Sequence, residues 1–264
     1  GGQLDLFASG KDSYIRHTGM AEAQSILQKE GKIYLVAGYE GQGTTPKTGT
    51  TLIDGRLDAS APNSGHGGFI ETSAAQVKIT DQAKVTTKAT QGKTGTWLID
   101  PTDFTISAGN AAQTTNAIGA TTLETNLSGT NVELRTSAAG SEKGNIYVNA
   151  DVAWSQNNLT LTAANSIYVN AVMDVNGTGT LALNTNTPDA ALVGTDTGSG
   201  TVKMAIGENG FTGKVNFQQV GDNLLMINGQ SYRVINDLGL EGSVNNTDLQ
   251  GMLGTNYSGH YALG

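Results

Sequence analysis

The sequence predicts an all-β protein built as a parallel β-helix (β-solenoid), with about 20–27 residues per coil and loop insertions. Three observations predict it. Short segments alternate apolar and polar residues, as in Leu159-Thr160-Leu161-Thr162, which is the pattern of half-buried strands. Similar phrases recur along the chain. Turns rich in Gly, Asn and Ser separate the strands and permit sharp corners.

Composition excludes several other classes. The chain has 264 residues with 36 Gly, only 4 Pro and 14 % charged residues. A disordered chain of this length would carry more charge and less Val, Ile and Leu. Collagen needs glycine at every third position, and that period is absent.

The net charge limits the possible binding partners, and the cysteine content bears on the cellular compartment. The net charge of −8 argues against a nucleic-acid partner, because neutralising phosphate needs clustered Lys and Arg. Cysteine is absent, which suits a secreted bacterial protein and a cytosolic one equally. No apolar run reaches the length of a membrane-spanning helix, and the first residues of the given sequence show neither a basic n-region nor an apolar h-region. We expect one continuous β-helix segment over 1–264, cut from a longer protein.

The repeat is visible when the chain is aligned with itself. Ile146 and Ile167 occupy equivalent places 21 positions apart, and Leu159 and Leu181 do so 22 positions apart. A unit of this size cannot bury its own apolar face, but stacked units can. The similar phrases form two series: 2–8, 31–37, 68–74, 144–150 and 165–171, and 131–134, 158–161 and 180–183.

Uneven spacing predicts insertions at the corners of the coils. The candidate loop insertions are 9–30, 39–50 and 107–119, since solenoids accept extra residues at corners. Within the first, residues 18–28 suit either one short helix or a long turn.

Three phrases resemble a known family. LDASAPNSGHGGFIETS (57–73) and KTGTWLIDPTDFTI (93–106) are similar to motifs of two-partner-secretion exoproteins, the filamentous haemagglutinin-like and high-molecular-weight-adhesin-like proteins. LQGM (249–252) followed by YSGHYALG (257–264) resembles a glycine-rich adhesin repeat of the same proteins, so 235–264 is expected to begin such a repeat. The resemblance covers roughly residues 30–264.

The resemblance implies a right-handed β-helix exported through an outer-membrane transporter partner and displayed or released at the bacterial cell surface. Members serve in adhesion, biofilm cohesion, haem-carrier capture or contact-dependent inhibition. The secretion-targeting module with its Asn-Pro-Asn signatures is absent from this sequence. Recognition of the transporter therefore cannot be assigned to these residues.

No catalytic, metal or cofactor site is predicted. Asp54 with Asp58, and Asp100 with Asp103, are paired carboxylates of the kind that bind calcium or act in β-helical polysaccharide lyases. Asp before Gly or Pro is more often a turn residue, which favours a structural role. The three histidines, His17, His66 and His260, lack ligand spacing. Gly92-Lys93-Thr94 imitates a phosphate-binding loop, but Thr87 replaces its leading glycine.

Aromatic residues and sequons are the remaining candidates. Trp97 and Trp154 suit sugar stacking, although the apolar string around Trp97 favours core burial. Tyr147 and Tyr168 should point outward and stack, as a binding face or only as a stabilising pair. Five Asn-x-Ser/Thr sequons are candidates for glycosylation or chance matches: Asn126, Asn158, Asn176, Asn245 and Asn256.

The expected function is that of a structural and adhesive rod segment in a large secreted surface exoprotein, without enzymatic activity. Its ligand would be a host-cell or biofilm glycan or protein, and end-to-end self-association is a further expectation. The alternatives are a receptor module capturing a host protein or glycan through a loop, the stalk of a contact-dependent inhibition toxin, and a polysaccharide-cleaving enzyme.

Overall fold

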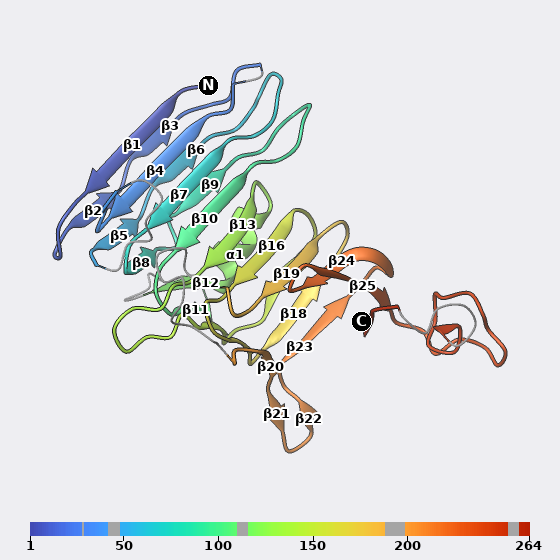
Figure 1. Ribbon diagram of the computed structural model, residues 1–264. Coiled ribbons are helices and arrows are strands. Elements are labelled where there is room, and N and C mark those ends of the chain that lie inside the picture. The colour runs from blue at the N-terminus through green and yellow to red at the C-terminus, as the bar shows by residue number, and fades with distance from the viewer. Residues whose placement is uncertain (28, 42–47, 110–115, 188–198, 253–258) are drawn as a thin grey trace.

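The computed structural model describes all residues except 28, 42–47, 110–115, 188–198 and 253–258. Strands make up 47 % of it and helix 4 %, so the chain is all-β, as predicted. Long sheets of parallel strands dominate, an arrangement consistent with a solenoid-like β-helix. Figure 1 shows these strands stacked from the blue N-terminal end to the orange C-terminal part.

The largest sheet, sheet A, has ten strands. Its first eight pair in parallel, each with the strand contributed by the next part of the chain. In order these strands are β1 (Gln3–Ala8), β4 (Lys32–Ala37), β7 (Phe69–Ser73), β10 (Thr96–Asp100), β13 (Asn131–Arg135), β16 (Asn158–Thr162), β19 (Thr180–Asn184) and β24 (Gly221–Ile227), followed by β25 (Gln230–Ile235) and β26 (Tyr261–Leu263).

The second sheet, sheet B, has eight strands in the order β2-β5-β8-β12-β11-β14-β17-β20. All seven pairings in it are parallel. The strands are β2 (Tyr14–His17), β5 (Thr50–Ile53), β8 (Gln76–Ile79), β12 (Ala117–Gly119), β11 (Phe104–Ser107), β14 (Ile146–Val148), β17 (Ile167–Val169) and β20 (Val202–Met204).

A third face is divided between two small parallel sheets and one helix. Sheet C holds β3 (Met20–Glu22), β6 (Arg56–Asp58) and β9 (Lys84–Thr86), and sheet D holds β15 (Val152–Trp154), β18 (Val172–Val175) and β23 (Lys214–Phe217). The helix α1 (Ala120–Leu127) contacts both β9 and β15 and so lies between these sheets. An antiparallel hairpin, β21 (Ile206–Gly207) and β22 (Gly210–Phe211), precedes β23.

Up to β23, the described residues therefore form seven successive units, each giving one strand or more to sheets A and B and one element to the third face. Unit 1 is β1-β2-β3, unit 2 is β4-β5-β6, unit 3 is β7-β8-β9, unit 4 is β10-β11-β12-α1, unit 5 is β13-β14-β15, unit 6 is β16-β17-β18, and unit 7 is β19-β20-β23.

The register confirms the repeat. Ile146 lies opposite Ile167, and Leu159 lies opposite Leu181. One alignment needs correction, because the first three phrases of the longer series lie in sheet A whereas 144–150 and 165–171 lie in sheet B. They look alike because each places a small polar turn before an alternating strand.

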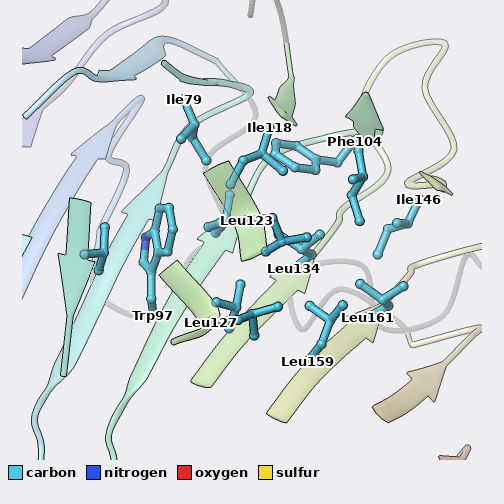
Figure 2. Packing of buried hydrophobic residues seen from close by; sticks show 14 of the residues in the cluster. Ile79, Trp97, Phe104, Ile118, Leu123, Leu127, Leu134, Ile146, Leu159 and Leu161 are labelled. Carbon is cyan, nitrogen blue, oxygen red and sulfur yellow. The ribbon is translucent and has the colours of Figure 1, made fainter. Parts of the chain in front are cut away.

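The apolar positions of the three faces meet in one buried cluster that extends from Ile15 to Val234. Its bulkiest members gather at unit 4, where Trp97 and Phe104 from strands pack near Leu123 and Leu127 of α1 (Figure 2). Each such side chain contributes about 1.5–3 kcal/mol by burial. The inward rows therefore supply the cohesion of the stack.

The expected insertion at 9–30 differs from the structure. Residues 9–30 contain β2 and β3, which pair in register with β5 and β6, so this segment is an ordinary part of unit 1. Residues 18–28 hold β3 rather than a helix, since Ala21 fills an inward position opposite Leu57. Segment 39–50 does connect β4 to β5, and its residues 42–47 lie outside the described part.

Segment 107–119 adds a strand to sheet B. β11 is followed by a connection that returns to form β12, which pairs beside β11 on the side of β8. Unit 4 thus gives sheet B two strands and sheet A one. The pairing of β12 with β8 is short, with Ala117 opposite Lys78 as its one pair of residues.

Side-chain amides complete the hydrogen bonding that unit 4 interrupts. The Asn126 Oδ1 atom of α1 accepts from the Val85 amide at 2.6 Å, and its Nδ2 donates to the Ala83 carbonyl at 3.1 Å. Asn116 does the same at β8, accepting from Val77 at 2.7 Å and donating to Ala75 at 3.0 Å. Each side chain thus serves a donor and an acceptor two residues apart, as a neighbouring strand would.

The parallel order ends after β24. β25 runs antiparallel to β24, and β26 pairs with β25. The segment 235–264, expected to begin a further repeat, therefore contributes β26 to sheet A, and its residues 253–258 lie outside the described part. Antiparallel β25 interrupts the one-strand-per-unit pattern of sheet A.

We expect Asn126→Asp to lower the free energy of unfolding by about 2–3 kcal/mol, because the carboxylate cannot donate to the buried Ala83 carbonyl. Urea unfolding followed by far-UV circular dichroism measures the change. Asn209→Asp, the same substitution at an exposed position of the β21–β22 hairpin, is the matched control. Equal stability of the two variants would show that the Asn126 bonds contribute nothing.

Candidate functional site

The paired carboxylates have separate structural partners. Asp54 accepts a hydrogen bond from Thr80 Oγ1 and lies 3.8 Å from Arg16 Nη2. Asp58 is 2 % exposed, pairs with Arg56 Nη2 at 2.7 Å and accepts from the Ser60 amide at 2.9 Å. The carboxylates of Asp54 and Asp58 are therefore both engaged in structural contacts that stabilise the turns around β6.

The environment of Asp58 keeps it ionised. Burial by itself raises the pKa of this carboxyl, but hydrogen bonds from Arg56 and Ser60 outweigh burial and hold the pKa below its ordinary value. A carboxylate with a lowered pKa is a poor proton donor near neutral pH. It suits a structural ion pair better than acid catalysis.

Asp100 and Asp103 also differ in surroundings. Asp103 Oδ1 accepts from the Asn145 amide at 2.7 Å and so holds the start of β14. Asp100, 5 % exposed, ends β10 in sheet A and lies in the electrostatic field of Arg135. Nothing in this arrangement matches a pair of carboxylates facing one open substrate site.

The histidines are dispersed. His17 Nε2 contacts the Arg56 carbonyl oxygen at 3.0 Å, and His66 Nδ1 accepts from the Lys93 amide at 3.0 Å. His260 lies edge-on to Tyr232. Across the described residues, no group of three or more His, Cys, Asp or Glu side chains is placed to hold a metal ion.

Both tryptophans belong to the core. Trp97 is fully buried, and its Nε1 donates to Thr72 Oγ1 at 3.0 Å. Trp154 is 4 % exposed. Neither indole offers a face to a sugar, so the core position favoured for Trp97 is confirmed and the stacking platform is excluded for both.

Tyr147 and Tyr168 form the expected outward stack on sheet B. Their ring centroids are 4.9 Å apart with an interplanar angle of 15°. The Lys203 Nζ atom lies 4.6 Å from the Tyr168 centroid and donates to its hydroxyl at 3.1 Å. Because the rings cover each other and Lys203 covers Tyr168, most of their flat surface is already occupied. This favours the stabilising role.

Side-chain amides flank this stack on both sides. Asn165 Nδ2 donates to Asn145 Oδ1 at 2.9 Å, and Asn170 Nδ2 donates to Asn149 Oδ1 at 2.7 Å. These bonds join units 5 and 6 along the outside of sheet B, parallel to the backbone ladder.

The sequons differ in access. Asn126 is 3 % exposed and its amide is fully engaged, so a glycan there would displace the bonds to β9. Asn158 and Asn176 are half-buried, Asn245 is exposed, and Asn256 lies outside the described residues. Among the four sequons in the described part of the chain, Asn245 is the one most open to modification.

A partly exposed group of rings lies on the outward side of sheet A and just beyond the end of β4, and the sequence did not lead us to expect it. We call Phe7, Tyr34, Tyr39 and Phe69 the aromatic patch. Phe7 stacks on Tyr39 at 4.3 Å, and the centroids of Phe7–Tyr34 and Tyr34–Phe69 are 6.4 and 5.8 Å apart. The signal was present, because three of these rings occupy outward places in aligned phrases of units 1–3.

One pocket of about 320 Å³ lies at the corner between sheets A and B in units 1–3. Gly49 and Thr50, at the end of the expected loop 39–50, form part of its wall. Its volume is at the lower limit for small-molecule sites, and its lining is largely polar. The lining residues are Lys11, Asp12, Ser13, Tyr14, Gly49, Thr50, Ala75 and Gln76.

Comparison with known proteins gives no relative: no family model, curated protein or solved structure matches this chain. Among the described residues, no helix has both the length and the apolar character needed to cross a membrane.

We expect Asp58→Asn to lower the free energy of unfolding at pH 7 by about 1.5 kcal/mol, the net value of a hydrogen bond to a charged group. Because the folded pKa of Asp58 is lowered, its contribution is present above the unfolded value near 3.9 and is lost as the pH falls through the folded pKa. Urea titrations from pH 7 to pH 3 should show the gap from wild type closing in acid. The exposed Asp81→Asn is the control, and a pH-independent gap would contradict the assignment.

A double-mutant cycle with Tyr147→Leu and Tyr168→Leu should give a coupling of about 0.5–1.5 kcal/mol, the value of an aromatic pair beyond burial. Chemical unfolding of the four proteins measures it. Tyr147→Leu combined with Tyr14→Leu should show additive effects. Additivity in the first cycle would mean that the stack is incidental.

Proposed function

We propose that this chain is a right-handed parallel β-helix that serves as a rod segment of a large secreted bacterial surface protein, in adhesion, aggregation or biofilm cohesion. The supporting observation is the run of eight parallel strands in sheet A, one from each successive part of the chain. Each unit then contacts only its neighbours, so length grows with the number of units.

General chain geometry supports the hand. Consecutive strands of sheet A are parallel and are joined by connections through sheet B and the third face. Connections between parallel strands of one sheet are right-handed in about 98 % of cases. A right-handed coil also agrees with the family that 57–73 and 93–106 resemble.

The resemblance supports the surface location and a secretion partner in the outer membrane. The phrase 93–106 spans β10 and β11 and supplies the buried Trp97, Ile99, Phe104 and Ile106. The similarity therefore concerns residues that build the coil. The partner at the host or biofilm surface would be a glycan or protein, and the structural partners of Asp54, Asp58 and Asp103 favour a non-enzymatic role.

Small-angle X-ray scattering of the purified protein tests the rod, and adhesion of protein-coated beads to epithelial cells and to biofilm tests the role. We expect an elongated particle and bead retention above that of beads coated with albumin. A compact particle would contradict the rod, and retention equal to albumin would contradict the adhesive role.

A receptor module is the second candidate, because the corner pocket adjoins the 39–50 segment. Deleting residues 41–49 should then abolish binding to a glycan or host-protein array while leaving the circular dichroism spectrum unchanged. Binding that survives the deletion would exclude this loop.

A further inference from the structure

The aromatic patch is flanked by carboxylates. Tyr34 on β4 lies directly opposite Asp5 on β1 and Glu71 on β7, so an acidic group stands on each side of the ring. Gln3 Nε2 donates to both oxygens of Asp5 at 3.0 and 2.9 Å, and Ser73 Oγ donates to Glu71 Oε1 at 2.8 Å. These bonds hold both carboxylates in place beside the rings.

The partial burial of Glu71 and Tyr34 favours the binding of a cation beside them. Burial raises the pKa of Glu71, partly offset by Ser73 and Arg135, and burial together with Glu71 and Asp5 raises the pKa of Tyr34. Both directions describe a surface on which further negative charge is disfavoured. An incoming positive group would offset the cost of keeping Glu71 ionised.

The rings near Tyr34 are set at angles that suit a cation. A cation is attracted to the face of an aromatic ring, and several rings that enclose it form an aromatic cage. The planes of Phe7 and Tyr34 meet at 54°, and those of Tyr34 and Phe69 at 53°. The planes of Phe7 and Tyr39 are nearly parallel, at 6°, and these two rings each cover one face of the other. The tilted walls beside Tyr34 therefore favour a cation.

Two cations of the chain, Arg135 and Lys32, lie near these carboxylates. Arg135 donates through Nε and Nη2 to Glu133 Oε1, so its guanidinium is directed to that carboxylate. Lys32 is exposed, two residues before Tyr34 on β4, and its charge opposes an incoming cation. The net charge of −8 attracts basic partners over a longer range.

We propose that the aromatic patch, with Asp5 and Glu71, binds arginine or lysine side chains of a basic protein segment. The inference rests on the proposed adhesive role, for which it names the partner chemistry. The cation would lie over the ring face of Tyr34, with Phe7 and Phe69 on either side of it. The carboxylates of Asp5 and Glu71 would neutralise its charge.

The test uses the full chain and an eight-residue peptide of alternating arginine and glycine, with binding measured by isothermal titration calorimetry at 150 mM salt. A peptide with citrulline in place of arginine, of the same shape and without charge, should bind at least tenfold more weakly. Phe7→Leu and Tyr34→Leu should each weaken arginine-peptide binding roughly two- to fivefold, the range for an exposed cation–π contact.

Matched variants separate the patch from general charge and from misfolding. Phe211→Leu removes an exposed aromatic ring of the β21–β22 hairpin, which belongs to neither the aromatic patch nor the corner pocket, and should change nothing. Glu71→Gln should weaken binding, and Lys32→Gln should tighten it, a gain that an unfolded protein cannot produce. Circular dichroism of each variant verifies the fold.

Equal binding of the citrulline peptide, or no effect of either ring variant, would overturn the proposal. So would binding of a β-linked glucose hexamer that depends on Phe7 and Tyr34 while the arginine peptide does not bind. Scattering and bead retention are separate measurements, so loss of cation binding leaves the rod and its adhesion to be judged on their own.

Discussion

The backbone hydrogen bonds between successive units are the constraint on which the rest of this structure depends. No unit can satisfy all of its own strands, because the strands of sheets A and B pair mainly with those of neighbouring units; within the seven units only β11 and β12, both of unit 4, pair with each other. The same stacking brings the inward rows together into one cluster from Ile15 to Val234. Polar satisfaction and apolar burial are thus achieved by one arrangement, and neither exists for a single unit.

Unit 4 shows how strictly this constraint is met. An α-helix cannot pair with a strand edge, yet α1 stands between β9 and β15. Asn126 serves Val85 and Ala83 on one side, while Glu124 accepts from the Ala153 amide at 2.8 Å on the other. The amide of asparagine carries both a donor and an acceptor on a short stem, which is why Asn can replace a peptide group here. The apolar side of α1, with Leu123 and Leu127, fills the core at the same time.

Much of the architecture was predictable because strand alternation is a local property. The 21- and 22-residue repeats gave the register of Ile146 with Ile167 and of Leu159 with Leu181, and the outward stack of Tyr147 on Tyr168 followed from it. Helix α1 was not predicted, since eight residues with two adjacent threonines carry little helical signal. The aromatic patch required knowing that the phrases at 2–8, 31–37 and 68–74 are neighbours in one sheet, whereas similar phrases at 144–150 and 165–171 lie in another.

The two strands and the helix of unit 4 also affect the direction of the axis. Between units 3 and 5, sheet A advances by two strand spacings, whereas sheet B advances by three, through β12 and β11. A strand spacing is about 4.8 Å, and packed sheets lie about 10 Å apart. If tilting alone accommodates the one extra strand of sheet B, unit 5 is tilted by about 25° relative to unit 3. The third face is widened at the same level, because a helix is about 10 Å across. An extra strand in sheet B and a helix on the third face, inserted in the same unit, therefore act as a wedge between the units before and after them. The position of that unit along the stack determines the direction in which the following units extend.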